Sequence, residues 1–288
     1  MYDALIGPFV DYEFMRRALV GAIALSLGGA PVGVFLMLRR MSLMGDAMAH
    51  AILPGAAIGY LLFGLALVPM TAGGIVAGFA VALTAGLVAR FTALKEDASL
   101  AAFYLMSLAL GVIIVSMRGS NVDLFRVLFG SVLALDDPTL ILLAAISTVT
   151  MLALALLWRP MVLDCVDPGF LRSVSRAGAP SHFVFLALVV LNLVAGFHAL
   201  GTLLAVGLMM LPAIAAQFWG RNVTVLTAVA VAFGVMSGYA GLVLSYNMST
   251  PSGPSIVLMA GVIYLLSLVF GPHGGLVATY WPARHREA

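Results

Sequence analysis

The sequence predicts an all-α, polytopic integral membrane protein with about eight or nine transmembrane helices. Of its 288 residues, 63% are hydrophobic and only 9% are charged, a balance that would leave large apolar patches on a water-exposed surface. The apolar residues also gather in stretches that match the hydrocarbon layer, which takes about 20 helical residues to cross. We therefore expect one transmembrane domain that spans residues 1–288.

Nine apolar stretches are long enough to cross the membrane, or nearly so. The first has no small-residue cleavage site and is expected to be a retained span rather than a signal peptide. A further stretch, Val122 to Leu135, is too short to span and carries two charges, so an interfacial or re-entrant helix is expected there. The nine stretches are 18–38, 45–64, 68–89, 99–117, 138–158, 183–198, 200–219, 223–246 and 255–271.

Basic residues set the expected orientation. If the N-terminus lies outside, ten of the fourteen Lys and Arg residues fall on the cytoplasmic side, and the positive-inside rule favours that arrangement. We therefore expect the N-terminus outside and the C-terminus in the cytoplasm. The ten residues are Arg39, Arg40, Arg90, Lys95, Arg159, Arg172, Arg176, Arg221, Arg284 and Arg286.

Small residues and prolines within the spans predict how the helices pack. Glycines cluster at 28–33 and at 73–78, where they let helix backbones approach closely in lipid. General helix packing is the favoured interpretation, and a dimer seam is the alternative. Pro54 and Pro212 are expected to kink or break their spans and to free backbone carbonyls.

The longest expected cytoplasmic loop covers about 159–181. Asp167-Pro168 is a helix-start signal, and Gly178 with Pro180 is a stop signal. The loop therefore has enough charged, helix-capable sequence to dock a soluble partner, and a simple solvated loop is the alternative.

Asp46 and His50 are the ionisable residues that most need an explanation. Each costs about 2.5 to 3.5 kcal/mol at the bilayer centre unless it is partnered or wet. Their i, i+4 spacing puts carboxylate and imidazole on one face of a helix. This donor pair suits manganese, zinc or ferrous iron better than alkali metals or copper(I). A two-fold dimer with this face on its axis would supply four ligands.

Two structural explanations compete with a cation pathway. Asp46 could cap the start of the second span, and His50 could be an interior histidine bonded to a neighbouring carbonyl. Because a regular helix rises about 1.5 Å per residue, His50 would lie near mid-bilayer, where capping of the helix explains Asp46 but not His50.

Several functional classes lack support in the sequence. The net charge is only +2 with no polybasic stripe, so nucleic acid is not an expected partner. A single cysteine, Cys165, excludes a disulfide within the chain. The chain has one lysine, Lys95, outside any phosphate-binding loop, and no nucleophile elbow or His-Glu-x-x-His motif. We expect a protein that is not an enzyme and holds no cofactor.

Four regions carry a resemblance that covers almost the whole chain. The most specific is MSLMGDAMAHAILPG at 41–55; the others are LFGS at 128–131, short motifs within 192–213, and SGPSIV at 252–257. Together they resemble the membrane permeases of bacterial ABC importers for zinc, manganese and iron.

The resemblance implies a permease of the bacterial inner membrane that moves a divalent transition-metal ion into the cytoplasm. Such permeases form homodimers, are driven by ATP hydrolysis in separate cytoplasmic ATP-binding subunits, and receive the metal from an extracytoplasmic metal-binding protein. Closure driven by ATP would move the cation inward along the dimer axis. ATP would therefore be bound by the partner subunit and not by this chain.

The resemblance also implies roles for individual residues. Asp46 and His50 match the acid and histidine that are thought to contact the cation. The segment after Cys165 resembles a coupling helix that docks in a groove of the ATPase, although Cys165-Val166 replaces the usual aromatic residue and Gly178 comes later than in the family pattern. The residues expected to couple to the ATPase are Asp167, Pro168, Phe170, Arg172 and Gly178.

Two other classes of membrane protein are alternatives to this interpretation. A proton-coupled secondary cation carrier would use Asp46 and His50 as a proton relay, but such carriers often show inverted repeats, and the two halves of this sequence show no convincing similarity. A membrane scaffold without transport would leave both residues unexplained.

Overall fold

Helices make up the regular structure of the described chain. The computed structural model describes residues 5–64, 66–94, 96–116, 135–167, 170 and 178–280, and no strand occurs among them. The helices are α2 (Gly7–Asp11), α3 (Glu13–Leu38), α4 (Met44–Ala51), α5 (Leu53–Phe63), α6 (Leu67–Phe91), α7 (Glu96–Ser116), α9 (Asp137–Val166), α11 (Gly178–Leu200), α12 (Thr202–Ala216), α13 (Val223–Met248), α14 (Ser252–Phe270) and α15 (Leu276–Tyr280).

The predicted spans correspond to these helices. Among the described residues, seven helical segments are long and apolar enough to cross a membrane, with α4 and α5 counted together. Two shorter apolar helices, Ala98–Ile114 within α7 and all of α12, account for the remaining predicted stretches. The prediction of an all-α polytopic membrane protein is therefore confirmed. The expected re-entrant helix falls almost wholly on 122–134, outside the described residues.

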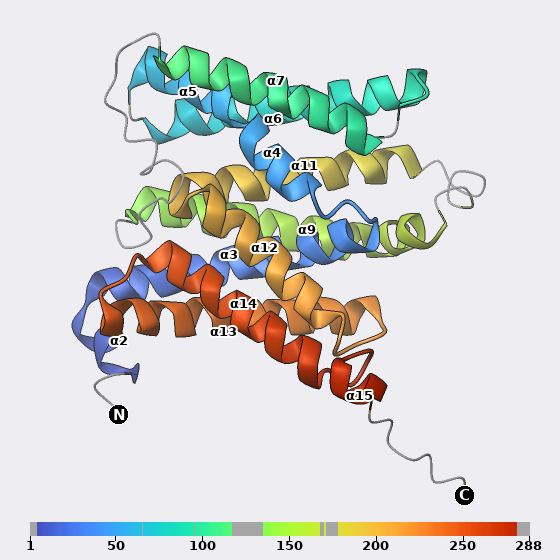
Figure 1. The fold of residues 1–288 in the computed structure, drawn as a ribbon. Coiled ribbons are helices and arrows are strands. Elements are labelled where there is room, and N and C mark those ends of the chain that lie inside the picture. The colour runs from blue at the N-terminus through green and yellow to red at the C-terminus, as the bar shows by residue number, and fades with distance from the viewer. Residues whose placement is uncertain are drawn as a thin grey trace, which may run out of the picture.

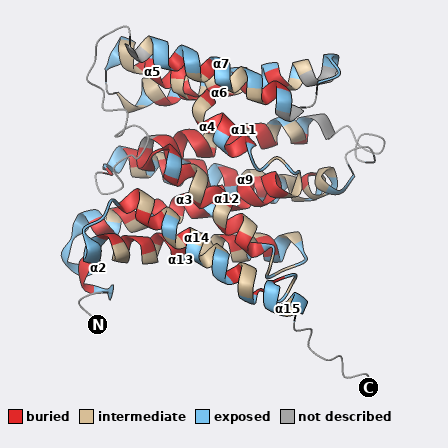
Figure 2. Ribbon diagram, in the orientation of Figure 1, coloured by how far each residue is buried: buried red, intermediate tan, exposed pale blue. Residues whose placement is uncertain are grey.

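The helices stack in layers, as Figure 1 shows. Helices α5, α6 and α7 form one side of the stack, α13 and α14 form the other, and α3, α9, α11 and α12 lie between them. In the apolar part of α3, 78% of the residues are buried, against 28% in α9, α13 and α14. Figure 2 shows the buried residues concentrated in the middle of the stack. Helix α3 is thus the central element, and the outer helices present apolar side chains to lipid.

The glycine clusters pack helices against each other within one chain. A Cβ on Gly33 would lie 2.0 Å from the carbonyl oxygen of Met209, and one on Gly55 would lie 1.9 Å from that of Gly73. These close approaches join α3 to α12 and α5 to α6. They support general helix packing as the explanation of both clusters.

The second predicted span is broken, but the span that contains Pro212 is not. Helix α4 ends at Ala51, and α5 begins at Leu53 with Pro54 in its first turn. Pro212 lies inside α12, which runs without interruption. The missing N–H of a proline is tolerated in the first turn of a helix, so Pro54 can begin a new helix. Between α11 and α12, Gly201 has a φ of 85°, which requires glycine.

The connection expected at 159–181 is shorter than the sequence suggested. Helix α9 continues to Val166, with Pro160 inside it, and α11 starts at Gly178. Met161 is fully buried in the core, so packing holds this end of α9 helical in spite of Pro160. The connecting segment is therefore 167–177.

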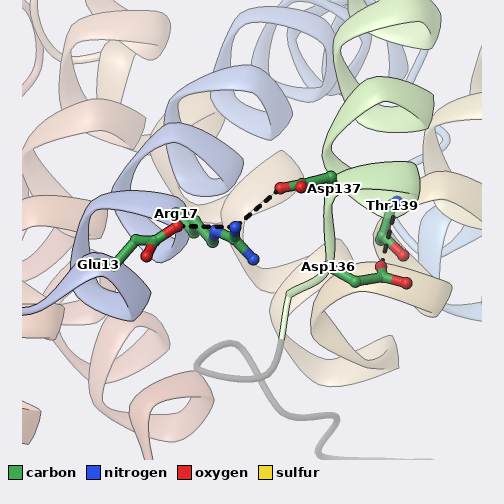
Figure 3. Close-up of polar contacts among 5 residues, drawn as sticks. All are labelled: Glu13, Arg17, Asp136, Asp137 and Thr139. Atoms are coloured by element: carbon green, nitrogen blue, oxygen red, sulfur yellow. Dashed lines mark hydrogen bonds and ion pairs between the residues drawn. The ribbon is translucent and has the colours of Figure 1, made fainter.

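The two ends of the stack carry different connections. The N-terminus and the start of α9 lie at the left in Figure 1, while the α9–α11 connection and the C-terminus lie at the right. At the left end, Arg17 contacts Glu13 at 2.8 Å and Asp137 at 3.1 Å, and Asp136 caps α9 by accepting from the N–H of Thr139 (Figure 3). The described chain thus begins, at α2, and ends, at α15, at opposite ends of the stack.

Candidate functional site

Helix α4 is a short helix that its neighbours hold at both ends. Near its start, a Cβ on Gly45 would lie 2.9 Å from Cε of Met209, so α4 packs directly on α12. At its end, the Ser107 hydroxyl of α7 donates to the carbonyl oxygen of Ala51 at 2.9 Å. The break after Ala51 leaves this carbonyl without a regular helical partner, and the serine supplies one. The break is therefore satisfied by a packed neighbour rather than by lipid.

Asp46 and His50 lie side by side on α4, as their spacing predicts. Nε2 of His50 is 3.8 Å from Oδ1 of Asp46. The His50 ring stacks against Tyr104 of α7, with ring centroids 6.5 Å apart and an interplanar angle of 27°. Tyr104 and Ser107 come from adjacent turns of α7, so one helix positions both the imidazole and the end of α4.

The two side chains differ in exposure. The Asp46 side chain is 67% exposed in the single chain, and that of His50 is 28% exposed. Asp46 is the third residue of α4, whose N-cap is Leu43 without a side-chain cap, so Asp46 does not cap the helix. A carboxylate left open to lipid would be costly. This face therefore needs a wet path, a cation or another subunit beside it.

One copy of the chain supplies few ligands at this place. Among the described residues, no group of three or more His, Cys, Asp or Glu side chains could hold a metal ion. Asp46 and His50 offer one carboxylate and one imidazole from successive turns. Such a pair could hold a transition metal only weakly, unless water or further groups complete the coordination.

The segment expected to couple to an ATPase is described in part. Asp167 ends α9, and its Oδ1 accepts a hydrogen bond from the N–H of Phe170 at 2.8 Å. This is the N-cap to N3 contact of a helix start, in agreement with the Asp167-Pro168 signal. Pro168 and Arg172 lie outside the described residues. Gly178 is the first residue of α11 rather than part of a loop.

Sequence reasoning missed the residues that support these elements. Ser107 and Tyr104 sit in an apolar span without a motif, so only their contacts with α4 reveal them. Arg39 was expected only as one of the basic residues of the cytoplasmic side, but its side chain is only 7% exposed and pairs with Asp164. One signal could have suggested this pair: Arg39 and Asp164 each lie close to the end of a predicted span.

Comparison with known proteins gives a consistent family. The model of the ABC 3 transport family matches residues 11–271. The manganese transport system membrane protein MntC of Halalkalibacterium halodurans is 32% identical over 96% of this chain and 94% of its own length. The manganese import system permease protein ScaB of Streptococcus parasanguinis is 30% identical over 93% and 96%. A probable iron transport system membrane protein of Haemophilus influenzae is 28% identical over 94% and 98%.

Solved structures show the same fold. PsaBC from Streptococcus pneumoniae, in complex with Fab, matches with a TM-score of 0.85 and 28% identity over 97% of this chain and 100% of that chain. An inward-facing conformation of a metal-chelate type ABC transporter matches with a TM-score of 0.68 and 16% identity over 88% and 85%. The second match supports the fold alone.

Proposed function

This chain belongs to the ABC 3 transport family, and on that premise we propose that it is the permease that carries manganese or ferrous iron into a bacterial cell. Like its relatives, it is a transport subunit and not an enzyme. The relatives named above are manganese and probable iron transport proteins. A carboxylate with an imidazole suits both metals, and it would also admit zinc.

The observation that carries the proposal is the exposed Asp46 beside His50 on a broken membrane helix. In a single chain Asp46 is 67% exposed, although α4 lies within an apolar span of 20 residues. A transported cation must be held by groups that can release it, and two ligands from one chain fit that requirement. Helix α4 would present both ligands to the cation path.

A second copy of the chain would complete the site. Two copies related by a two-fold axis next to α4 would bring together two Asp46 and two His50 side chains. Their two negative charges would offset a divalent cation, and their four ligands would allow tetrahedral coordination. Formation of the dimer would also cover the exposed carboxylates, which removes the cost of leaving them open to lipid.

The other partners would bind at opposite ends of the stack. An ATP-binding subunit would dock on 167–177, where the carboxylate of Asp167 accepts a hydrogen bond from the N–H of Phe170. An extracytoplasmic metal-binding protein would deliver the cation at the other end, which includes the N-terminus and the start of α9 (Figure 1). In this proposal the chain lies in the inner membrane, with the N-terminus outside and the C-terminus in the cytoplasm, as the distribution of basic residues favours.

The proposal is tested by uptake of radioactive manganese, iron and zinc into cells that lack other importers. The permease is expressed with its ATPase and binding protein. We expect ATP-dependent uptake of manganese or iron, and loss of uptake to the background level in both Asp46→Asn and His50→Ala. Asp137→Asn is the matched control, since this aspartate is 71% exposed in the first turn of an apolar helix away from α4.

Each outcome has a clear meaning. Normal uptake in Asp46→Asn and His50→Ala would show that the pair is structural. Uptake that follows the proton gradient and ignores ATP would replace the proposal with a secondary carrier. Loss of uptake in Asp137→Asn as well would mean that the effect of Asp46→Asn is not specific to the site.

A further inference from the structure

Arg39 forms a buried cluster with residues of two other helices. It is the C-cap residue of α3. Its Nη2 lies 2.7 Å from Oδ2 of Asp164 in the last turn of α9, and the two side chains are 7% and 10% exposed. Its Nη1 donates to Nδ1 of His182 on α11 at 3.2 Å. Its guanidinium lies 4.1 Å from the ring centroid of Phe185, also on α11. We call these four residues the Arg39 cluster.

The Arg39 cluster holds both ends of the 167–177 connection. Asp164 precedes that segment by three residues along α9, and His182 follows it early in α11. One planar guanidinium contacts both Asp164 and His182, because its N–H donors point in fixed, different directions. The start and the end of the segment where an ATPase would dock are therefore tied to the same residue of α3.

A short, hydrogen-bonded turn joins Arg39 to α4. The N–H of Arg40 donates to Met37 at 3.0 Å, and the N–H of Met41 donates to Leu36 at 2.9 Å. This is the Schellman pattern of a helix end, with Arg40 in the left-handed region at a φ of 59°. The N–H of Met44 then donates to the carbonyl of Met41 at 3.0 Å, and α4 begins. Because its backbone is hydrogen-bonded, the turn connects Arg39 to the start of α4 rigidly.

From these contacts we infer that Arg39 is a positioning residue that transmits movement of the end of α9 and the start of α11 to α4 and its Asp46–His50 pair. A displacement of these two helix ends moves Asp164 and His182, and their contacts with the guanidinium move the end of α3. The rigid turn after Arg39 then moves the start of α4. The end of α4 is held separately by Ser107, so α4 tilts about that end. This inference rests on the proposed function, since it requires a docked ATPase.

The buried setting favours such transmission. A guanidinium that pairs with an exposed carboxylate can exchange it for water at little cost. At 7% and 10% exposure, the Arg39 and Asp164 side chains leave little room for water to replace either partner, so separating the two ions is costly and they move together. The Phe185 ring, fully buried beneath the guanidinium, limits its movement further.

The test uses Arg39→Met/Asp164→Leu, which removes both charges and leaves no ion unpaired. The complete complex with ATPase and binding protein is reconstituted in liposomes, and the number of metal ions imported per ATP hydrolysed is measured. We expect the double variant to assemble and hydrolyse ATP but to import about tenfold less metal per ATP, a typical size for coupling between sites. Arg17→Met/Asp137→Leu is the matched control, since it removes an Arg–Asp pair between the same two helices, and it should keep the wild-type ratio.

A second readout does not depend on the transported solute. Hydrogen exchange of the peptide at 41–52 is compared with and without ATP. We expect ATP to change the exchange in the wild type and in the control variant, but not in the double variant. Arg39→Lys keeps the charge but replaces the forked guanidinium with a single ammonium, so it should lose less coupling than the double variant. It replaces the double variant in the test if that variant does not fold.

The outcomes separate this inference from the proposed function. The inference would be overturned if the double variant kept both the wild-type ratio of metal imported per ATP and the wild-type exchange pattern. The same result in Arg39→Lys would overturn it if only that variant folds. No effect of ATP on the 41–52 peptide of the wild type would overturn it as well. If the wild type imports no metal but ATP changes that peptide only when the Arg39 cluster is intact, the assignment of a metal cargo fails, while the coupling of a docked ATPase to α4 stands.

Discussion

Two Arg–Asp pairs join α3 to α9, one at each end of the stack, and they differ in burial. At the end that holds the N-terminus, Arg17 and Asp137 are 34% and 71% exposed and 3.1 Å apart (Figure 3). At the other end, Arg39 and Asp164 are 7% and 10% exposed and 2.7 Å apart. The same residue types on the same two helices therefore make a surface contact at one end and a buried contact at the other.

Helix dipoles sharpen the difference. Asp137 lies in the first turn of α9, where a negative charge is favourable even without Arg17. Asp164 lies in the last turn of α9, where a negative charge is unfavourable, so it depends on Arg39. The comparison indicates that an ion pair constrains a helix end where both charges are buried and the helix dipole does not stabilise the carboxylate.

The largest expected effect is the loss of Arg39. Arg39→Met leaves Asp164 buried without its counter-charge, which typically costs about 3 to 5 kcal/mol. The free energy of unfolding in mixed detergent and SDS micelles should fall by that amount. Arg39→Met/Asp164→Leu should recover most of the loss, because buried pairs can be replaced by apolar side chains at little cost. A double variant as unstable as Arg39→Met would contradict this account of the buried pair.

A smaller effect is expected at the cap beside the exposed pair. Asp136→Ala removes the side chain that accepts from the N–H of Thr139, a change that typically costs about 1 kcal/mol. The same unfolding measurement should show this loss. Asp137→Ala is the control, since it alters the neighbouring aspartate without touching the cap, and it should cost less. Equal losses would mean that the local negative charge, and not the cap, supports the start of α9.

The smallest effect is expected for the exposed pair itself. Arg17→Met should cost about 0 to 1 kcal/mol, because water screens an exposed pair, and added salt should reduce the loss further. Unfolding at low and high salt measures both quantities. A loss that matches that of Arg39→Met, or one that salt leaves unchanged, would show that burial does not distinguish the two ends.

Local sequence patterns predicted the helices well. Each of the nine apolar stretches overlaps one or two helices of the described chain, since helix formation in lipid follows from apolar length and from the need to satisfy backbone groups internally. The Asp46–His50 contact was also predictable, because i, i+4 neighbours meet on any helix. Its role in transport remains a prediction from family resemblance and chemistry.

Other features could not be read from local patterns. Pro54 separates two helices and Pro212 does not, although both are prolines within apolar stretches. At the α4–α5 break, the hydroxyl of Ser107 donates to the carbonyl oxygen of Ala51, a tertiary contact that no local pattern specifies. The end of α9 was placed too early because the apolar stretch gives way to a charged segment at Arg159, whereas burial of Met161 keeps the helix intact through Val166.

The sequence by itself determined the class of protein, the places of its spans and the pairing of Asp46 with His50, because these follow from hydrophobicity and helix period within short segments. The tertiary structure decided which charges are buried and what they connect. Arg39, Asp164 and His182 are far apart in the sequence, and their contact depends on how α3, α9 and α11 pack. No property of a single segment specifies that packing, since it is set by side chains that meet only when the helices assemble.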